Sequence, residues 1–135
     1  MVTYLSTEWL DRVRELATVD EALSAASQGV ELTLQQVVTD TPHGDVRYYV
    51  TFDDGDVYVQ AGDVTEPDVT FTQDYRTAVG VATGELGALD ALRDGRVVLT
   101  GDPTALQDRA AVLGALDTVF GQVREETTYP ERERR

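Results

Sequence analysis

Hydrophobic residues recur at helical spacing in the first part of this chain. Ser6 or Thr7 is the expected cap of a first helix, and Asp20 begins a second, shorter helix that ends at Gly29. The apolar face of the first helix consists of Trp9, Leu10, Val13, Leu16 and Ala17. This spacing predicts that the first helix lies with that face on the core.

Strict alternation of apolar and polar residues follows and predicts four strands. The alternating segments are residues 30–35, 46–52, 57–60 and 69–72. The turn Thr41-Pro42-His43-Gly44 precedes the second segment, and Asp53-Asp54-Gly55 follows it as a hairpin signal. A period of two predicts that one face of this sheet is buried and that the other face is in water.

The last part of the chain predicts three helices and a fifth strand. Asp74 is the expected cap of a helix from Tyr75 to about Thr83, which Gly84 ends. The later elements are a helix over Leu86–Arg93, a strand over Arg96–Thr100 and a helix from Pro103 to about Glu126. Gly95 stands where a helix end favours a left-handed residue, and Asp102-Pro103 supplies the cap and first residue of the last helix.

The last helix has a wider apolar face than packing on a sheet requires. At about 100° per residue, its apolar side chains fill roughly half of the circumference. They are Leu106, Ala110, Val112, Leu113, Leu116, Val119, Phe120 and Val123. This arc either packs on the sheet and a second helix, or lines in part a cavity or a partner groove. Arg109 and Asp117 project inside the arc, so they either reach solvent at its rim or contact the polar head of a buried ligand.

The composition indicates an acidic domain. The 135 residues carry a net charge of −14, and all 11 basic residues are arginine. We expect one domain over residues 1–126 and a disordered charged tail over residues 127–135. The negative field disfavours nucleic acids and anionic membrane surfaces as partners, so membrane contact is at most transient. The sequence has no signal-peptide pattern and no apolar run of roughly 20 residues, so we expect a cytoplasmic protein.

The residues give little support for catalysis. His43 is the only histidine, and it lies in a turn, away from the serines at 6, 24 and 27 that a triad would need. The chain has no lysine for a Schiff base and no cysteine for a thiolate or a zinc site. The acidic run Asp53-Asp54-Gly55-Asp56 lacks the spacing of an EF-hand loop. We therefore predict no enzyme, and no catalytic residue, metal site or cofactor.

One long stretch, from Asp68 to Phe120, has a recognisable order of elements. It contains Asp68-Val69-Thr70-Phe71-Thr72, then Asp74-Tyr75, then Gly84, and then the segment from Ala91 to Asp102. This order resembles the sterol carrier protein 2 family. The resemblance implies an α+β fold whose five-stranded, largely antiparallel sheet has the order 3-2-1-4-5, with helices on one face. It also implies a tunnel between sheet and helices for fatty acids, acyl-CoA or sterols, and a function in lipid transfer or presentation.

We predict a domain that binds an apolar or amphipathic small molecule by burial. The expected lining is Val79, Leu86, Leu89, Leu99, Leu106, Leu113, Leu116 and Phe120, with Arg109 or Asp117 as a polar contact. Burying an acyl chain yields about 0.8 kcal/mol per CH₂, which offsets association costs of about 4–15 kcal/mol. Two alternatives stay open. One is an interaction module or homodimer that uses the apolar face of the last helix, and the other is an accessory protein in small-molecule biosynthesis.

Overall fold

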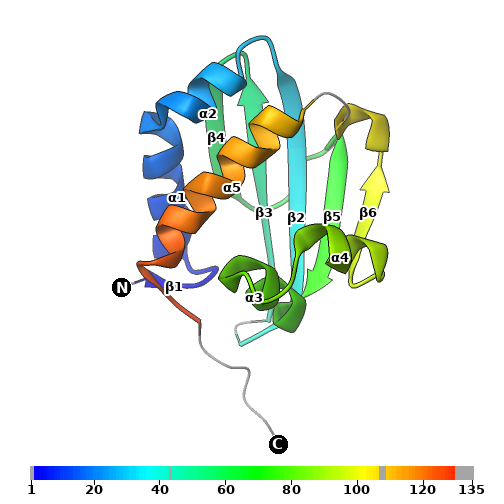
Figure 1. Cartoon of the computed structure of the whole chain (residues 1–135). Coiled ribbons are helices and arrows are strands. Elements are labelled where there is room, and N and C mark those ends of the chain that lie inside the picture. The colour runs from blue at the N-terminus through cyan, green and yellow to red at the C-terminus, as the bar shows by residue number, and fades with distance from the viewer. Residues whose placement is uncertain (1, 43, 107–108, 130–135) are drawn as a thin grey trace, which may run out of the picture.

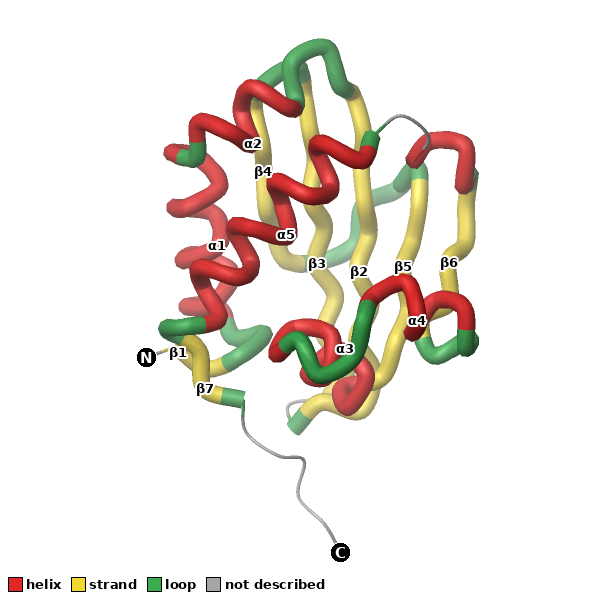
Figure 2. The backbone as a smooth tube through the Cα atoms, viewed as in Figure 1, coloured by secondary structure: helices red, strands yellow, loops and turns green. Residues whose placement is uncertain are grey.

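The computed structural model describes residues 2–42, 44–106 and 109–129, without the side chains at positions 88, 89, 106 and 110. Five strands form one sheet, and the helices lie together on one of its faces (Figures 1 and 2). The α+β class predicted from the sequence is therefore confirmed. The elements in chain order are β1 (Val2–Thr3), α1 (Thr7–Val19), α2 (Glu21–Ala26), β2 (Glu31–Thr41), β3 (Gly44–Asp53), β4 (Asp56–Ala61), β5 (Val69–Asp74), α3 (Tyr75–Thr83), α4 (Ala88–Arg93), β6 (Val97–Gly101), the 3₁₀ helix η1 (Pro103–Leu106), α5 (Ala110–Arg124) and β7 (Thr127–Thr128).

The five strands have the predicted order. They lie side by side as β4, β3, β2, β5 and β6, which is 3-2-1-4-5 when these strands are counted along the chain. β2 pairs with β5 in parallel, and the other pairings are antiparallel. β2 continues to Thr41, beyond the alternating segment 30–35, because it has a hydrogen-bonded partner on each side.

Side-chain caps begin three of the helices at the predicted residues. The Ser6 hydroxyl accepts a hydrogen bond from the backbone N–H of Trp9 at 3.2 Å. The carboxylate of Asp20 accepts from Leu23 at 2.8 Å, and that of Asp74 accepts from Thr77 at the same distance. Each cap satisfies a backbone donor that the first turn of a helix leaves unpaired, so these boundaries follow from local sequence.

Gly95 ends α4 as predicted. Its φ is +79°, and two backbone hydrogen bonds close the helix end, from Arg96 N to Ala91 O at 2.9 Å and from Gly95 N to Leu92 O at 3.2 Å. This is the Schellman arrangement, which favours glycine at the left-handed position. The chain then turns directly into β6.

The prediction of one continuous last helix from Pro103 is wrong. Pro103–Leu106 forms a separate 3₁₀ turn, and α5 begins only at Ala110. Asp102 does cap this turn, because its carboxylate accepts from Thr104 N at 3.0 Å. The backbone of Arg109 is not helical, with φ −110° and ψ 14°, and the chain changes direction here from the edge of the sheet to a diagonal path across it (Figure 1).

The first residues of the predicted tail, 127–129, have a defined place in the structure. Thr127 and Thr128 pair in parallel with Val2 and Thr3, and Tyr4 N donates to Thr128 O at 2.9 Å. The two-residue strands are too short to show as alternation, and their pairing joins distant parts of the sequence. Residues 127–129 therefore belong to the folded part, whereas residues 130–135 of the predicted tail lie outside the described residues.

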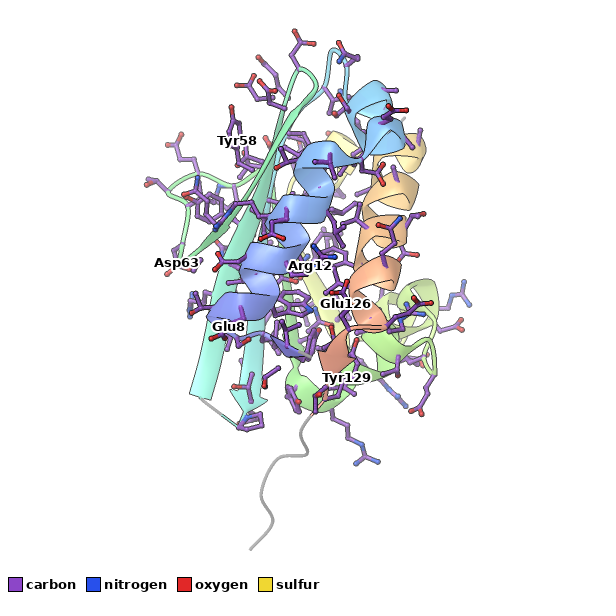
Figure 3. All side chains as sticks on the ribbon, turned by 90° about the vertical axis from the view of Figure 1, so that its left-hand side faces the viewer. Glu8, Arg12, Tyr58, Asp63, Glu126 and Tyr129 are labelled. Atoms are coloured by element: carbon purple, nitrogen blue, oxygen red, sulfur yellow. The ribbon has the colours of Figure 1, made fainter. Side chains whose placement is uncertain are left out.

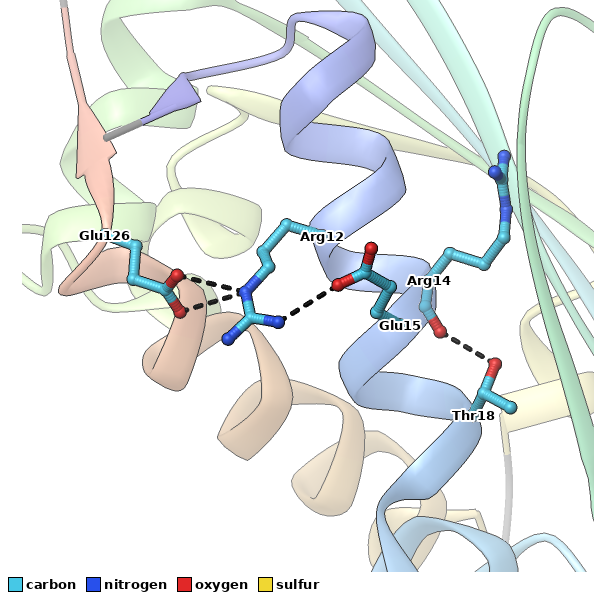
Figure 4. Close-up of polar contacts among 5 residues, drawn as sticks. All are labelled: Arg12, Arg14, Glu15, Thr18 and Glu126. Atoms are coloured by element: carbon cyan, nitrogen blue, oxygen red, sulfur yellow. Dashed lines mark hydrogen bonds and ion pairs between the residues drawn. The ribbon is translucent and has the colours of Figure 1, made fainter.

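An ion pair fixes the end of α5 against α1. Nε of Arg12 donates to both carboxylate oxygens of Glu126, at 3.0 and 3.1 Å, and Nη1 donates to Glu15 at 3.0 Å (Figure 4). Figure 3 shows Arg12 and Glu126 beside each other, between the two helices. Together with the pairing of β1 and β7, this contact joins the two ends of the fold.

The face of the sheet opposite the helices is covered in part, which the alternation did not predict. After β4, the chain crosses this face to reach β5 (Figure 2). Gln35 is only 4% exposed and holds the crossing segment. Its Nε2 donates to Gly62 O at 3.1 Å, and its Oε1 accepts from Val64 N at 2.9 Å. A buried amide on this face is stable because its polar atoms have partners.

Candidate functional site

The helix-facing surface of the sheet has two parts that differ in burial. On β2, β3 and β4, five inward side chains are at most 2% exposed, and we call this group the sealed half. Its residues are Leu34, Val38, Val50, Phe52 and Val59. On β5 and β6, the opposing residues Phe71 and Leu99 are only half-buried, and we call their surroundings the half-covered side. Val69, at the start of β5, is fully buried and marks the border between the two.

The path of the helices explains this difference. α5 runs diagonally in front of the sheet and packs on α1 and α2, above the strands of the sealed half (Figure 1). The short helices α3 and α4 lie over one end of β5 and β6. The five side chains of the sealed half therefore have full cover, whereas Phe71 and Leu99 have partial cover.

α5 has a buried row and a half-buried row of side chains. The buried row consists of Val112, Leu116, Val119 and Val123. The neighbouring row, which we call the α5 flank, consists of Arg109, Leu113, Phe120 and Arg124, all half-buried. Helical spacing places the four on one stripe. The predicted wide arc of the last helix is thus two adjoining rows with different surroundings.

Most of the predicted lining residues are half-buried. Those residues are Val79, Leu86, Leu99, Leu113 and Phe120, whereas Leu116 is 6% exposed. Of the two predicted polar contacts, Arg109 is half-buried on the α5 flank and Asp117 is exposed. The side chains of Leu89 and Leu106 lie outside the description, so their predicted roles remain predictions.

Two contacts place the α5 flank relative to its neighbours. Gly84, which ends α3 in a left-handed conformation, is a neighbour of Arg124. A side chain at this position would bring its Cβ atom to 3.7 Å from Nη1 of Arg124. At the middle of the flank, the ring of Phe120 stacks on Trp9 with centroids 5.8 Å apart. The flank therefore borders the end of α3 at one point and the core at another.

Two glutamines place polar groups on the helix-facing surface of the sheet. Gln36 stands two residues after Leu34 on β2, so its side chain points to the same face of the sheet. Its partner on the neighbouring strand β5 is Phe71. Nε2 of Gln73 donates to Oε1 of Gln36 at 3.4 Å, and both residues are half-buried. The half-covered side thus combines aromatic and aliphatic side chains with a pair of amides.

Two arginines of the α5 flank have an unusual environment. Nε of Arg109 and Nε of Arg124 are both enclosed and lack a hydrogen-bond partner. Elsewhere in the described chain, Arg12, Arg47 and Arg93 each pair with a carboxylate. A buried donor without a partner costs free energy, so an arginine in this state is a candidate ligand contact.

The sequence analysis named Arg109 but missed Arg124. The signal was present, since Arg124 follows Phe120 by one helical turn and Leu113 by three. No acidic residue stands three or four positions from it. The helical period could therefore have identified an unpaired cation at the end of the apolar stripe.

Tyrosines gather beside the end of α5. The ring of Tyr4 lies 4.9 Å from that of Tyr129 and 6.1 Å from that of Tyr75, measured between centroids. Burial raises the pKa of all three phenols, most strongly that of Tyr4. The positive charge of Arg124 acts in the opposite direction and partly offsets this rise in the pKa of Tyr129. These hydroxyls are neutral at physiological pH.

A shallow pocket of about 220 Å³ lies elsewhere, between α1 and β4. Its lining includes Arg14, Thr18, Asp56 and Gln60, and none of the predicted ligand contacts. Nε of Arg14 donates a hydrogen bond to the backbone oxygen of Val59 at 2.8 Å. This oxygen belongs to β4, the strand at the edge of the sheet. The pocket is explained by this polar packing, and it is distinct from the half-covered side.

The residues considered for catalysis have structural partners or lie outside the description. His43 is outside the described residues, and Ser27 is fully buried with its hydroxyl donating to Ser24 O at 3.1 Å. Asp54, in the acidic hairpin, accepts from Gly29 N at 2.6 Å. Among the described residues, no three acidic or histidine side chains cluster as metal ligands would. No helix in the described ranges has the length and apolar character to cross a membrane.

Comparisons with known proteins agree with the fold. The model of the SCP-2 sterol transfer family matches residues 10–114. A crystal structure of sterol carrier protein 2 has a TM-score of 0.74 and 22% identity, over 88% of this chain and 98% of that chain. The solution structure of a conserved hypothetical protein from Thermus thermophilus, described as possibly a sterol carrier protein, has a TM-score of 0.75 and 21% identity, over 98% and 96%.

A third solved structure was determined with a lipid. Palmitated SCP2L2 from Aedes aegypti has a TM-score of 0.56 and 23% identity, over 85% of this chain and 94% of that chain. At these identities the structural matches support the fold alone. A comparison with curated proteins finds no significant match.

Proposed function

Because the chain belongs to the SCP-2 sterol transfer family, we propose that it is a lipid carrier that holds one apolar or amphipathic molecule on its half-covered side. The observation that supports this proposal most is the contrast in burial within one surface. The five residues of the sealed half are at most 2% exposed, whereas Phe71 and Leu99 are half-buried. Apolar surface left uncovered inside a fold is what an apolar ligand can complete.

The proposed contacts come from three elements. Leu99 lies on the sheet, Val79 belongs to α3, and Leu113 belongs to α5. Leu86, Leu89, Leu106, Leu116 and Phe120 complete the proposed lining, and Arg109 or Asp117 is the proposed polar contact. α5 covers the apolar side chains of the sealed half. The ligand would thus cover the apolar side chains of the half-covered side in its place.

The proposed binding requires no catalytic step. Burial of an acyl chain contributes about 0.8 kcal/mol per CH₂, so a long chain yields on the order of 10 kcal/mol. This exceeds the lower part of the 4–15 kcal/mol range for the cost of association. A carrier has to release its ligand, and such a balance gives affinity without irreversible binding.

A titration with a fluorescent fatty acid and a fluorescent sterol tests the proposal. We expect the full chain to bind at least one of them in the micromolar range. Leu99→Gln should weaken binding about tenfold, because it removes apolar contact worth roughly 1.5 kcal/mol. Val98→Gln is the matched control, since Val98 is the next residue on β6, points to the opposite face and is 49% exposed.

Native mass spectrometry of the purified protein completes the test. A co-purifying lipid released by denaturation supports the carrier. An empty homodimer, together with no uptake of either probe at tens of micromolar, would overturn it. That result would instead favour a second copy as the cover of the α5 flank.

A further inference from the structure

Arg124 lacks the partners that an arginine in a folded protein normally has. It is the last residue of α5 and is half-buried, and its Nε is enclosed without a hydrogen-bond partner. The ion pairs among the described residues do not include it. The neighbouring acids do not supply a partner, because Glu126 pairs with Arg12 and Glu125 is exposed. Among the described residues, an enclosed side-chain nitrogen without a hydrogen-bond partner occurs only at Arg124 and Arg109.

Tyr129 follows Arg124 by five residues, and its phenol is neutral at physiological pH. Tyr129 lies within range of its charge, and the ring of Tyr4 is 4.9 Å from that of Tyr129. Burial keeps both phenols protonated, so they do not compete as anions for the guanidinium. A guanidinium with an unpartnered Nε is a favourable environment for a carboxylate, because charge-assisted hydrogen bonds are the strongest of their kind.

The distance along α5 fits one acyl chain. Leu113 and Arg124 are on the same stripe, and the rise of an α-helix places them about 16 Å apart along its axis. Half of the hydrocarbon core of a bilayer, about 15 Å, is the span of one lipid chain. An acid whose head is at Arg124 would therefore extend along the α5 flank to Leu113.

We propose that Arg124 binds the carboxylate of a long-chain acid, and that the ligand of the half-covered side is this acid rather than a neutral sterol. The proposal rests on the proposed carrier function and names the class of its ligand. One guanidinium suits a single negative charge. The overall negative field disfavours a ligand with several phosphates.

A pair of probes that differ only at the head group tests the proposal. A fluorescent long-chain fatty acid and its methyl ester are titrated into the full chain at neutral pH. We expect the wild-type protein to bind the acid about tenfold more tightly than the ester. Arg124→Gln should lose this preference by weakening acid binding alone, and Arg124→Lys should retain part of it, because lysine keeps the charge but lacks the bidentate geometry.

Two arginine variants serve as controls. Arg93→Gln removes an exposed arginine of α4 that pairs with Asp90, and we expect it to leave both affinities unchanged. Arg109→Gln removes the other unpartnered Nε of the flank. If Arg109→Gln abolishes the preference for the acid, the carboxylate of the ligand lies at Arg109 rather than at Arg124, and the proposal for Arg124 is wrong.

The remaining outcomes separate this proposal from the carrier function. Equal binding of acid and ester by the wild-type protein would overturn the carboxylate site and leave the carrier function intact, and this result does not depend on whether any variant folds. An equal loss for both probes in Arg124→Gln would also overturn it, because the residue would then only support packing. Failure of the wild-type protein to bind either probe would instead count against the carrier function itself.

Discussion

The sealed half and the half-covered side use the same kinds of residue with different results. Phe52 on β3 is 1% exposed, whereas Phe71 on β5 is half-buried, although both face the helix layer. The difference arises from the path of α5, which packs on α1 and α2 and leaves β5 and β6 to two short helices. One half of the sheet therefore provides stability, and the other leaves apolar surface that the proposed ligand would cover.

Truncation of the two phenylalanines gives the largest expected effect. Phe52→Ala should lower the free energy of unfolding by about 3–5 kcal/mol, because it leaves a cavity in a closed core. Phe71→Ala should cost no more than about half of this, since part of its ring is already in water. Urea unfolding followed by circular dichroism measures both. Equal losses would mean that the half-covered side is as closed as the sealed half.

The next effect is stabilisation by the ligand. A fatty acid at about 100 times its dissociation constant should raise the free energy of unfolding by about 2.7 kcal/mol. Hydrogen exchange should show added protection that includes β5 and β6, because their amides lie beneath the proposed ligand. Leu99→Gln should lose most of the gain, and Val98→Gln should keep it. A gain confined to β3 and β4 would contradict the assignment of the site.

Alkaline pH tests the tyrosines at the end of α5. Burial raises the pKa of Tyr4, Tyr75 and Tyr129 in the folded state, so folding favours the neutral phenols. Their contribution is complete below the unfolded pKa of about 10 and is lost as the pH rises through the folded values. Stability should fall above about pH 10 by up to roughly 1.4 kcal/mol per pH unit for each phenol. Urea unfolding at several pH values measures the slope, and Tyr4→Phe should reduce it. An unchanged slope would exclude Tyr4 as a contributor.

The smallest effect is expected on the exposed surface of α4. Arg93→Gln breaks an ion pair with Asp90 whose side chains are 75% and 66% exposed. We expect a change of at most about 0.5 kcal/mol in the free energy of unfolding, because water screens such pairs. A loss well above about 1 kcal/mol in urea unfolding would show that α4 contributes more to the cover of β6 than its exposure indicates.

Elements with local signals could be predicted from the sequence. Asp20 and Asp74 cap helices, Gly95 ends one, and alternation located the strands of the sheet. The strand order followed from the resemblance to a family rather than from the residues. β7 could not be predicted, because two-residue strands have no period and their pairing depends on distant residues.

The candidate site was predictable only as helix and strand faces. Periodicity placed Leu113 and Phe120 on one face of the last helix, but the division of that face into two rows depends on which neighbours α5 meets. The break before Ala110 was missed because the sequence on both sides favours helix, and the change of direction is set by tertiary packing. The surroundings of Arg124 depend on the end of α3, which no local pattern connects to it.

The pairing of β1 with β7 has a consequence for synthesis on the ribosome. Val2 and Thr3 leave the ribosome more than 120 residues before their partners Thr127 and Thr128. α1 can pack on β4 before α5 exists, but the N-terminal strand has to wait for its partner. Domains fold during translation as their segments appear, so the helix layer over the sheet is complete only after α5 and residues 127–128 have left the exit tunnel.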